Sequence, residues 1–321
     1  MLTRRTALAA PLLLPALAQA QAVSFNRPIR LIIPFAPGGT SDIIARLLAP
    51  GLGTELGQNV VVENRTGANG NIAADLVAKS PPDGHTLLLT DTGSLATAPA
   101  LFTKLPFDVA KDLSPVTMLI FAPYLFAVHP SVPAKTVAEL VAYARANPGK
   151  LNVAHSGVGS ANQLTAIVLA KHFDINWAYV PYRGGAAAVQ ATAQNETQVV
   201  LNGATATAPF AQDNRLRGLA VSGEERISIL PDLPSFKELA MPATDSGTWQ
   251  GIVAAGGTPA PVLARLSDAF RKVLAEPTIA QRITGLGAVN RAEGPESFNA
   301  WMTDAIATWG RVVKDAGITL D

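Results

Sequence analysis

Residues 29–42 read IRLIIPFAPGGTSD. This pattern predicts a buried strand at Ile29–Ile33, a tight turn at Gly38-Gly39 and a helix that begins near Thr40 or Ser41. The first N–H groups of a helix have no partner within it and the helix dipole is positive at that end, so such a junction favours an anion. The two hydroxyl groups add hydrogen-bond donors. The alternative is a purely structural turn, in which glycine only allows a positive φ.

The composition limits the class of protein. The chain has 321 residues, enough for two lobes, and a net charge of +1 with 15% charged residues. We expect no nucleic-acid partner, because no run rich in Lys or Arg occurs. The sequence contains no cysteine, which excludes disulfides, thiolate nucleophiles and zinc sites built on cysteine.

The N-terminus has the pattern of an export signal. It combines a charged start at Arg4-Arg5, a short apolar stretch from Leu8 to Leu17 and small residues at Ala18-Gln19-Ala20. The apolar stretch is shorter than the roughly 20 residues of a membrane span. We therefore expect a signal peptide at 1–22, exported by the general secretory or the twin-arginine route, and a soluble protein in the periplasm.

Strand and helix patterns alternate along the rest of the chain. The first series contains expected strands at Ile29–Ile33, Val60–Glu63 and Thr86–Thr90, and a second series starts near Leu125. The alternation predicts an α/β fold with two lobes, each a mostly parallel sheet flanked by helices. Ligands of such sheets bind at the carboxyl ends of the strands. The further strands expected lie at 125–128, 151–154, 178–180, 199–201 and 216–221, with a helix at 137–146.

A second turn rich in Gly and Ser covers residues 156–160 and precedes another expected helix. Two helix N-termini would then face one cleft between the lobes, which suits a small anion. Near the C-terminus, Thr258-Pro259 and Gly294-Pro295 are expected to be the N-cap and first residue of two helices. The apolar stripe from Phe298 to Val313 is interpreted as a packing face.

Motifs of known catalytic chemistry are missing from the sequence. No phosphate-binding loop, nucleophile elbow or zinc-protease pattern occurs, and the four histidines match no metal-ligand spacing. We expect no catalytic residue, cofactor or metal. His155 adjoins the second turn, where it either lines a site or is structural. Arg183 either pairs with a carboxylate or is solvated, and the turn at 64–70 is interpreted as structural, capped by Asn69.

A set of short motifs resembles the periplasmic substrate-binding receptors of tripartite tricarboxylate transporters, often called Bug-type receptors. The motifs occur in the family's order from residue 27 almost to the C-terminus. They are RPIR (27–30), PFAPGGTSD (34–42), VVENRTGANG (61–70), PDGHTLL (82–88), VPYRG (180–184), PDLPS (231–235), GTPAP (257–261) and WGRVVKDAGI (309–318).

The resemblance implies a two-lobed periplasmic binding protein, type II-like, that closes on a small carboxylate and delivers it to an integral-membrane permease. We expect a monomer, with 23–124 plus 247–321 as lobe 1 and 125–246 as lobe 2. The resemblance also implies ligand contacts from both turns and from the cleft floor. These are Phe35, Ala36, Gly38, Gly39, Thr40 and Ser41 on one side, Ser156, Gly157, Gly159 and Ser160 opposite, and Thr90, Asp91 and Thr92 on the floor.

Three positions depart from the family's pattern. The family usually has a small hydroxyl residue at His155, histidine at Gln163 and aspartate at Asn202. We hypothesise that Asn202, and a His155 that becomes cationic at mildly acidic pH, favour an anionic ligand without an amino group. Such a ligand would be a di- or tricarboxylate or an aromatic acid. His155, Arg183 and Asn202 are therefore further candidate ligand-binding residues.

Two other functions stay open from the sequence alone. A sensor that docks on a signalling kinase would use the same ligand trap as a transport receptor. A secreted hydrolase would need catalytic groups that converge in space without adjacent sequence. In the receptor, we expect the lobes to move about chain crossings near 121–125 and 243–247.

Overall fold

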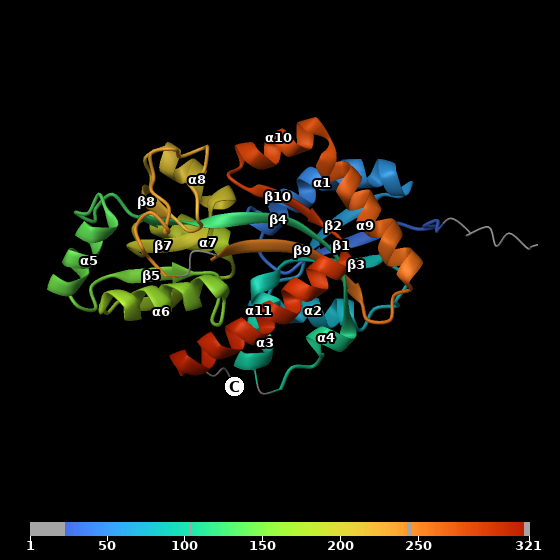
Figure 1. Cartoon of the computed structure of the whole chain (residues 1–321), viewed down its shortest axis with the longest axis horizontal. Coiled ribbons are helices and arrows are strands. Elements are labelled where there is room, and N and C mark those ends of the chain that lie inside the picture. Colours follow the sequence, from blue (N-terminus) through green and yellow to red (C-terminus); the bar gives the residue numbers. More distant parts are fainter. Residues whose placement is uncertain (1–22, 103, 243–245, 318–321) are drawn as a thin grey trace, which may run out of the picture.

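The computed structural model describes residues 23–102, 104–242 and 246–317 (Figure 1). The expected signal peptide at 1–22 lies outside the described residues, as does part of the expected chain crossing at 243–247. In Figure 1 the blue and cyan N-terminal elements lie on one side and the green and yellow elements on the other. The C-terminal elements, in orange and red, return to the N-terminal side.

The first half of the fold contains the strand pattern expected from its sequence. Strand β1 (Ile29–Ile33) lies between β2 (Val60–Asn64) and β3 (Thr86–Asp91) and is parallel to both. Ile29, Leu31, Ile32 and Ile33 are fully buried, and each such side chain contributes roughly 1.5–3 kcal/mol to folding. The helices of this half are α1 (Thr40–Leu56), α2 (Asn71–Ala78), α3 (Thr92–Leu101) and α4 (Val109–Asp112), with a short 3-10 turn, η1 (Ala68–Gly70), before α2.

Two long strands connect the halves. Strand β4 (Leu113–Val128) pairs antiparallel with β9 (Gly247–Ala255) near its start and with β7 (Val199–Gly203) near its end. At the crossing, the Tyr124 N–H donates to Ser222 Oγ (2.7 Å), and that hydroxyl donates to the carbonyl of Ser246. The strands are therefore tied together where the chain passes between the halves. Figure 1 shows β4 and β9 running side by side through the middle of the molecule.

The second half repeats the strand–helix alternation. Strand β5 (Asn152–His155) is parallel to both β6 (Ala178–Pro181) and β7. Strand β8 (Arg217–Val221) pairs antiparallel with β4. All strands expected in this half are present. The strand expected at 125–128 is the end of the longer β4, and the others differ from the expectation only slightly at their ends. The helices are α5 (Val137–Ala146), α6 (Ala161–Phe173), α7 (Gly185–Ala193) and α8 (Ala204–Gln212).

The C-terminal elements complete the first half. They are α9 (Ala260–Ala275), α10 (Pro277–Gly285), β10 (Val289–Glu293) and α11 (Pro295–Ala316). Helix α11 begins as expected, with Gly294 as N-cap and Pro295 as first residue. The expected start of α9 is wrong by one residue, because Pro259 is the N-cap. Thr258 instead donates its hydroxyl to the carbonyl of Ala255 (2.7 Å).

The sheet differs from the expected one in strand direction. Parallel pairs join β2–β1–β3 and β7–β5–β6, but every pair that involves β4 or β9 is antiparallel. The sheet is thus mixed rather than mostly parallel. The fold is α/β and two-lobed as expected.

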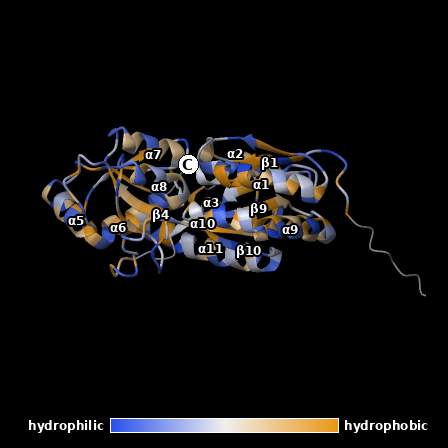
Figure 2. Cartoon of the chain, turned by 90° about the horizontal axis from the view of Figure 1, so that it is seen from above, coloured by the Kyte–Doolittle hydropathy of each residue, from blue (hydrophilic) through white to orange (hydrophobic). Residues whose placement is uncertain are grey.

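The buried apolar residues gather in separate clusters on the two sides. Two clusters draw their members from 25–122 and 252–305, and two others from 125–241. Figure 2 shows the hydrophobic colour along the strands between the helices. A small fifth cluster contains Leu101, Leu164 and Val313, so α11 contacts α6 of the other side.

Candidate functional site

A cavity lies where the N-terminal ends of α1, α3, α6 and α7 meet. Its empty volume is about 440 Å³, part of it open to solvent. Both halves of the fold contribute to its wall. We call it the inner chamber, and its lining residues are Phe35, Gly39, Thr40, Ser41, Asp91, Ser94, Tyr124, Ser156, Ser160, Asn162, Gly185, Asn202 and Thr248.

The chamber presents helix ends rather than cationic side chains. No Lys, Arg or His is among its lining residues. Within the described chain, the backbone N–H groups of Thr40 and Ser41 have no hydrogen-bond acceptor, since the first bond back into α1 comes from Ile43 to Gly39. Four helix N-termini around one cavity create a positive potential there without a formal charge. The arrangement is suited to a small anion.

The floor of the chamber depends on a close approach between the halves. Gly203, at the end of β7, lies against Thr40 and Thr248 of the other half. A Cβ at Gly203 would collide with the Thr248 side chain and would lie 2.8 Å from Thr40 Oγ1. Only glycine allows the strand to pack this closely.

Asp91 is the one acidic residue among those lining the chamber. Its Oδ1 accepts a hydrogen bond from the Gly93 N–H (3.0 Å), and the carboxylate also accepts from the Thr248 hydroxyl and the Trp249 backbone. Burial outweighs these bonds and raises the pKa of Asp91 to about 7. A neighbouring anion would favour the protonated form further.

Tyr124 supplies a neutral donor beside this carboxyl. The residue is 2% exposed. Burial, and secondly the charge of Asp91, raise the pKa of the Tyr124 hydroxyl well above its usual value. The phenol therefore keeps its proton at physiological pH and can donate a hydrogen bond to a ligand.

The first Gly-Gly turn is closed by Asp42. The Gly38 N–H, at a φ of +83°, donates to Asp42 Oδ2 (3.0 Å), and Arg46 Nε and Asn64 Nδ2 donate to Oδ1 (3.0 and 3.1 Å). Burial acts to raise the pKa of Asp42, but these hydrogen bonds outweigh it and lower the pKa. The expectation that the Gly38 N–H is free for a ligand is therefore corrected, because Asp42 occupies it.

The second turn is closed by Gln163. The Gly159 N–H donates to Gln163 Oε1 (2.7 Å), so this expected donor is also occupied. The Asn162 amide bonds Ser156 Oγ (3.0 Å) and the carbonyl of Leu201 (2.9 Å), which holds the turn against β7. Asn162 was not predicted from the sequence as a chamber residue.

His155 has a structural position beneath the second turn. It is 1% exposed and does not line the inner chamber. Its Nδ1 lies 2.8 Å from the Gly157 carbonyl, which can only accept, so Nδ1 carries the proton. Burial lowers the pKa of His155 despite this hydrogen bond. This shift works against the cation that was expected at mildly acidic pH.

Ser160 provides a hydroxyl without a protein partner. It is the N-cap of α6, but its side chain makes no capping bond. Its Oγ is buried and, among the described atoms, has no hydrogen-bond partner. A buried hydroxyl in this state is costly unless a ligand or a water molecule satisfies it.

The structure brings half of the predicted site residues to the inner chamber. Ala36, Gly38, Thr90, His155, Gly157, Gly159 and Arg183 are not among its lining residues, and the side chain of Thr92 lies outside the description. Sequence reasoning missed Ser94, Tyr124, Asn162, Gly185 and Thr248. The predicted residues that do line it are Phe35, Gly39, Thr40, Ser41, Asp91, Ser156, Ser160 and Asn202.

A second cavity adjoins the first, and the two share Phe35 and Ser156. Its empty volume, about 1200 Å³, includes open solvent. We call it the outer chamber. Its lining residues are Pro34, Phe35, Thr66, Gly67, Ala68, Asn69, Gly70, Phe102, Ser156, Gly157, Val158, Tyr182 and Arg183.

Asn69 does not cap α2 as the sequence suggested. Gly70 is the N-cap of that helix, and Asn69 precedes it in a left-handed conformation (φ +52°). The side-chain amide is buried, and neither its nitrogen nor its oxygen has a partner among the described atoms.

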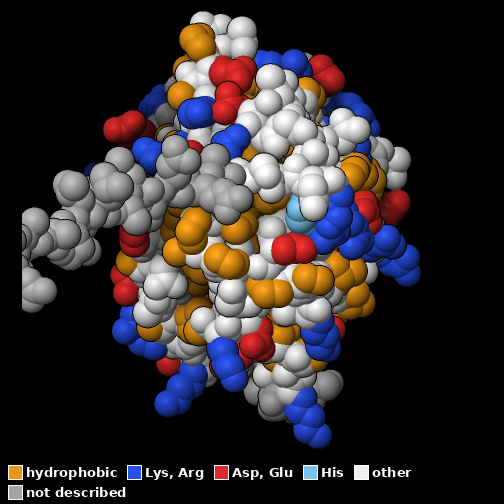
Figure 3. All heavy atoms as spheres, turned by 90° about the vertical axis from the view of Figure 1, so that its right-hand side faces the viewer, with side chains coloured by type: hydrophobic (Ala, Val, Ile, Leu, Met, Phe, Trp, Pro, Cys, Tyr) orange, Lys and Arg blue, Asp and Glu red, His pale blue; other side chains and the backbone are white. Residues whose placement is uncertain are grey.

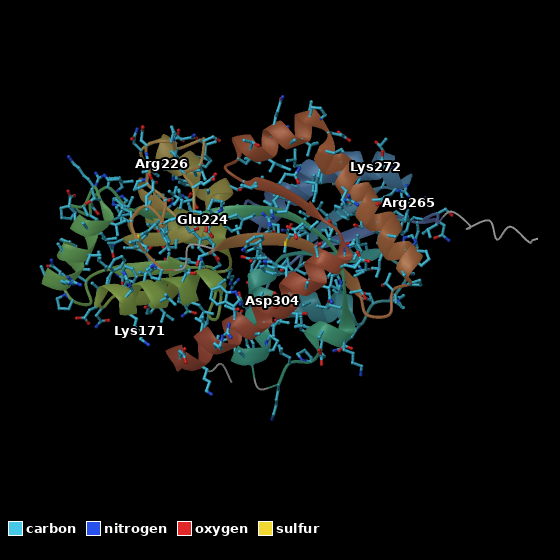
Figure 4. All side chains as sticks on the ribbon, in the orientation of Figure 1. Lys171, Glu224, Arg226, Arg265, Lys272 and Asp304 are labelled. Atoms are coloured by element: carbon cyan, nitrogen blue, oxygen red, sulfur yellow. The ribbon has the colours of Figure 1, made fainter. Side chains whose placement is uncertain are left out.

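The charged residues labelled in Figure 4 lie away from both chambers. None of the six residues labelled in Figure 4 lines either chamber; Arg265 and Lys272, for example, lie on α9. On the face shown in Figure 3, basic and acidic side chains are interspersed. In the described part of the chain, no three or more His, Asp or Glu side chains are placed to hold a metal ion. No helix there combines the length and the apolar character of a membrane span.

Comparison with known proteins identifies relatives of this fold. A family described as "Tripartite tricarboxylate transporter family receptor" matches residues 44–318. Protein BugT of Bordetella pertussis is 30% identical over 295 residues, which cover 92% of this chain and 90% of BugT.

Two solved structures with bound ligands are similar throughout. Rpa4515 of R. palustris, determined with adipate, has a TM-score of 0.87 at 30% identity and covers 92% of this chain and 99% of its own. MatC of Rhodopseudomonas palustris, with bound malate, has a TM-score of 0.84 at 31% identity, with 89% and 99% covered. A further solved structure, that of the periplasmic binding protein BugD, has a TM-score of 0.87 at 31% identity and covers 92% of this chain and 99% of its own. The family consists of substrate-binding receptors rather than enzymes. The chain belongs to the tripartite tricarboxylate transporter receptor family.

Proposed function

We propose that this protein is a periplasmic receptor that binds a small carboxylate in the inner chamber. The observation that carries the proposal is the meeting of four helix N-termini around a cavity lined by neutral donors. A helix N-terminus favours an anion by about 0.3–1 kcal/mol, and by up to about 2 kcal/mol when partly buried. Relatives of the same fold bind adipate and malate, so a carboxylate is the expected anion.

The rest of the proposal concerns how the ligand is captured and passed on. Residues 23–124 with 247–321 form lobe 1 and residues 125–246 form lobe 2, which close on the ligand about the crossing strands β4 and β9. This division is supported by the separate apolar clusters. After export directed by residues 1–22, the protein delivers the carboxylate to an integral-membrane permease. Deletion of the gene should abolish uptake of that carboxylate, and restoring it should recover uptake.

A thermal-shift screen of carboxylates tests ligand capture. A ligand that binds only the folded protein stabilises it by roughly 2.7 kcal/mol at a hundred times its dissociation constant. Gly39 lines the inner chamber and has an ordinary extended backbone, so Gly39→Leu adds bulk there without forcing a positive φ. We expect this variant to fold and to lose the ligand-dependent shift.

Gly310→Leu is the matched control, because a Cβ at that position of α11 meets nothing within 4 Å. It should keep the full shift. If no carboxylate raises the melting temperature of the wild-type protein, the proposed function is wrong. If Gly39→Leu keeps the wild-type shift, the ligand binds elsewhere.

A further inference from the structure

A third cavity lies on the other face of β9 from the inner chamber. Thr248 lines the inner chamber and its neighbour Trp249 lines this cavity, and successive side chains of a strand point to opposite faces. The empty volume is about 990 Å³, part of it open to solvent. Both halves of the fold form its wall, since Thr165 and Val168 belong to α6 and further lining residues belong to α11. We call it the rear cavity.

Three of the four tryptophans of the chain line the rear cavity, which makes its wall strongly aromatic. Trp249 and Trp301 form a tilted pair with ring centroids 5.1 Å apart, and Trp309 follows Trp301 about two turns along α11. All three side chains are half-buried. Among the described residues, the Trp309 ring contacts no other aromatic ring and no cation. Its aromatic face is therefore available to a ligand.

The apolar stripe on α11 has two parts. Phe298, Met302 and Val313 are buried in apolar clusters, as expected for a packing face. Trp301 and Trp309 lie at the margin of these clusters and remain half-buried beside the rear cavity. Large apolar side chains that stay exposed together mark a binding surface more often than a packing face.

Asp304 supplies the only charge among the described residues that line the rear cavity. It is exposed on α11 (Figure 4), and it follows Trp301 by three residues, so the carboxylate and the indole lie on one side of the helix. Within the described part of the chain, Asp304 forms no ion pair and no hydrogen bond. An unpaired carboxylate beside tryptophan rings repels an anion and attracts a cation.

The same group of aromatic rings contacts one cation of the chain itself. The guanidinium carbon of Arg291 lies 5.3 Å from the centroid of the Trp249 ring, and tryptophan attracts a cation more strongly than the other aromatic side chains do. Arg291 is not among the residues that line the rear cavity. It therefore leaves the two tryptophans of α11 to a cation from solution.

We propose that the rear cavity is a second ligand site, which binds an organic cation with a quaternary ammonium group between the tryptophans of α11 and Asp304. A quaternary ammonium group fits better than a primary amine, because it has no N–H donors that would lose their hydrogen bonds against the half-buried rings. The site differs in charge preference from the inner chamber on the opposite face of β9. The inference does not depend on the proposed function.

The test uses choline and its neutral counterpart, the alcohol in which a carbon atom replaces the choline nitrogen. Binding to the purified protein is measured by calorimetry and by tryptophan fluorescence. Choline should bind at least about tenfold tighter than the alcohol. Asp304→Asn should weaken choline binding about threefold, as expected for an exposed ion pair, and leave the alcohol unaffected.

Two variants of Trp309 test the aromatic contribution. Trp309→Leu keeps an apolar side chain but removes the ring, so it should weaken choline binding about fivefold to tenfold. Trp309→Phe keeps a smaller aromatic face and should recover part of the affinity. Urea denaturation of each variant separates a loss of binding from a loss of folding.

Asp213→Asn is the control for charge, because it removes the same charge from an exposed site at the end of α8. It should keep the wild-type affinity for choline. Equal affinities of the wild-type protein for choline and the alcohol would overturn the proposal, and this comparison needs no variant to fold. Undiminished choline binding in folded Asp304→Asn or folded Trp309→Leu would overturn it as well.

Discussion

The two turns that face the inner chamber hold a glycine N–H in the same way but with chemically different acceptors. In each, the N–H of a glycine at positive φ donates to a side chain four residues later, Gly38 to Asp42 and Gly159 to Gln163. The first acceptor is a carboxylate bonded by Arg46 and Asn64, and the second is a neutral amide. Since both glycine donors are occupied inside the turn, the groups left for a ligand belong to the residues that follow, where the helices begin.

The difference between the two acceptors has an electrostatic consequence. A carboxylate so near a carboxylate ligand would be repulsive unless it were compensated, and Arg46 lies 3.0 Å from Asp42 in an ion pair. Gln163 has no charge and needs no such partner. We infer that the glycine N–H is held by an ion-paired carboxylate in the first turn and by a neutral amide in the second.

The largest expected effect follows from removing each acceptor. Asp42→Ala removes the acceptor of three hydrogen bonds, from the Gly38 N–H, the Asn64 amide and Arg46, and should lower the free energy of unfolding by about 2–4 kcal/mol. Gln163→Ala leaves only the Gly159 N–H unpaired and should cost about 1–2 kcal/mol. Urea denaturation at neutral pH measures both. A larger loss for Gln163→Ala than for Asp42→Ala would contradict the assignment of ionic contacts to the first turn.

A smaller effect should appear in the pH dependence of binding. Burial raises the pKa of Asp91 to about 7, so the carboxyl becomes protonated as the pH falls from 8 to 6. The ionised form repels an anionic ligand and the protonated form does not, so affinity should rise in this interval, by about tenfold. The measurement is the dissociation constant at several pH values above the ligand's own pKa.

Asp91→Asn is the control for this pH dependence. The amide cannot ionise, so the variant should bind with nearly the same affinity at pH 6 and pH 8. Gln163→Ala changes no titratable group and should keep the wild-type pH profile. A pH-dependent affinity that persists in Asp91→Asn would show that another group is responsible.

Local sequence patterns predicted the parts of the fold that depend on near neighbours. The run at Ile29–Ile33, the Gly-Gly pair and Thr40 predicted β1 and the start of α1 correctly. Strand β9 was not predicted, and neither was the passage of β4 through both halves, because pairing between 113–128 and 247–255 depends on contacts distant in sequence. The mixed strand directions have the same cause.

The candidate site shows the same limit. Thr40, Ser41 and Ser160 were found because a glycine turn before a helix is visible in the sequence. Tyr124 and Thr248 come from the crossing strands and have no local signal. The use of the Gly38 and Gly159 N–H groups by Asp42 and Gln163 could have been suspected from the shared spacing of four residues. The burial of His155 beneath the second turn depends on tertiary packing and has no local signal in the sequence.

The smallest expected change in stability tests whether the Ser160 hydroxyl is structural or binds the ligand. Ser160 Oγ is buried without a partner in the described structure, so Ser160→Ala removes no protein hydrogen bond. The variant's free energy of unfolding should lie within about 0.5 kcal/mol of the wild-type value. It should nevertheless bind a carboxylate about threefold to tenfold more weakly, since one neutral hydrogen bond to the ligand is lost.

Thr207→Ala is the contrasting variant, because its hydroxyl donates to the Gly203 carbonyl (3.0 Å) and accepts from Asn202 (3.3 Å). It should lose stability. Unchanged affinity in Ser160→Ala would mean that water, and not the ligand, satisfies this hydroxyl, and the second turn would then contribute to binding through its backbone alone.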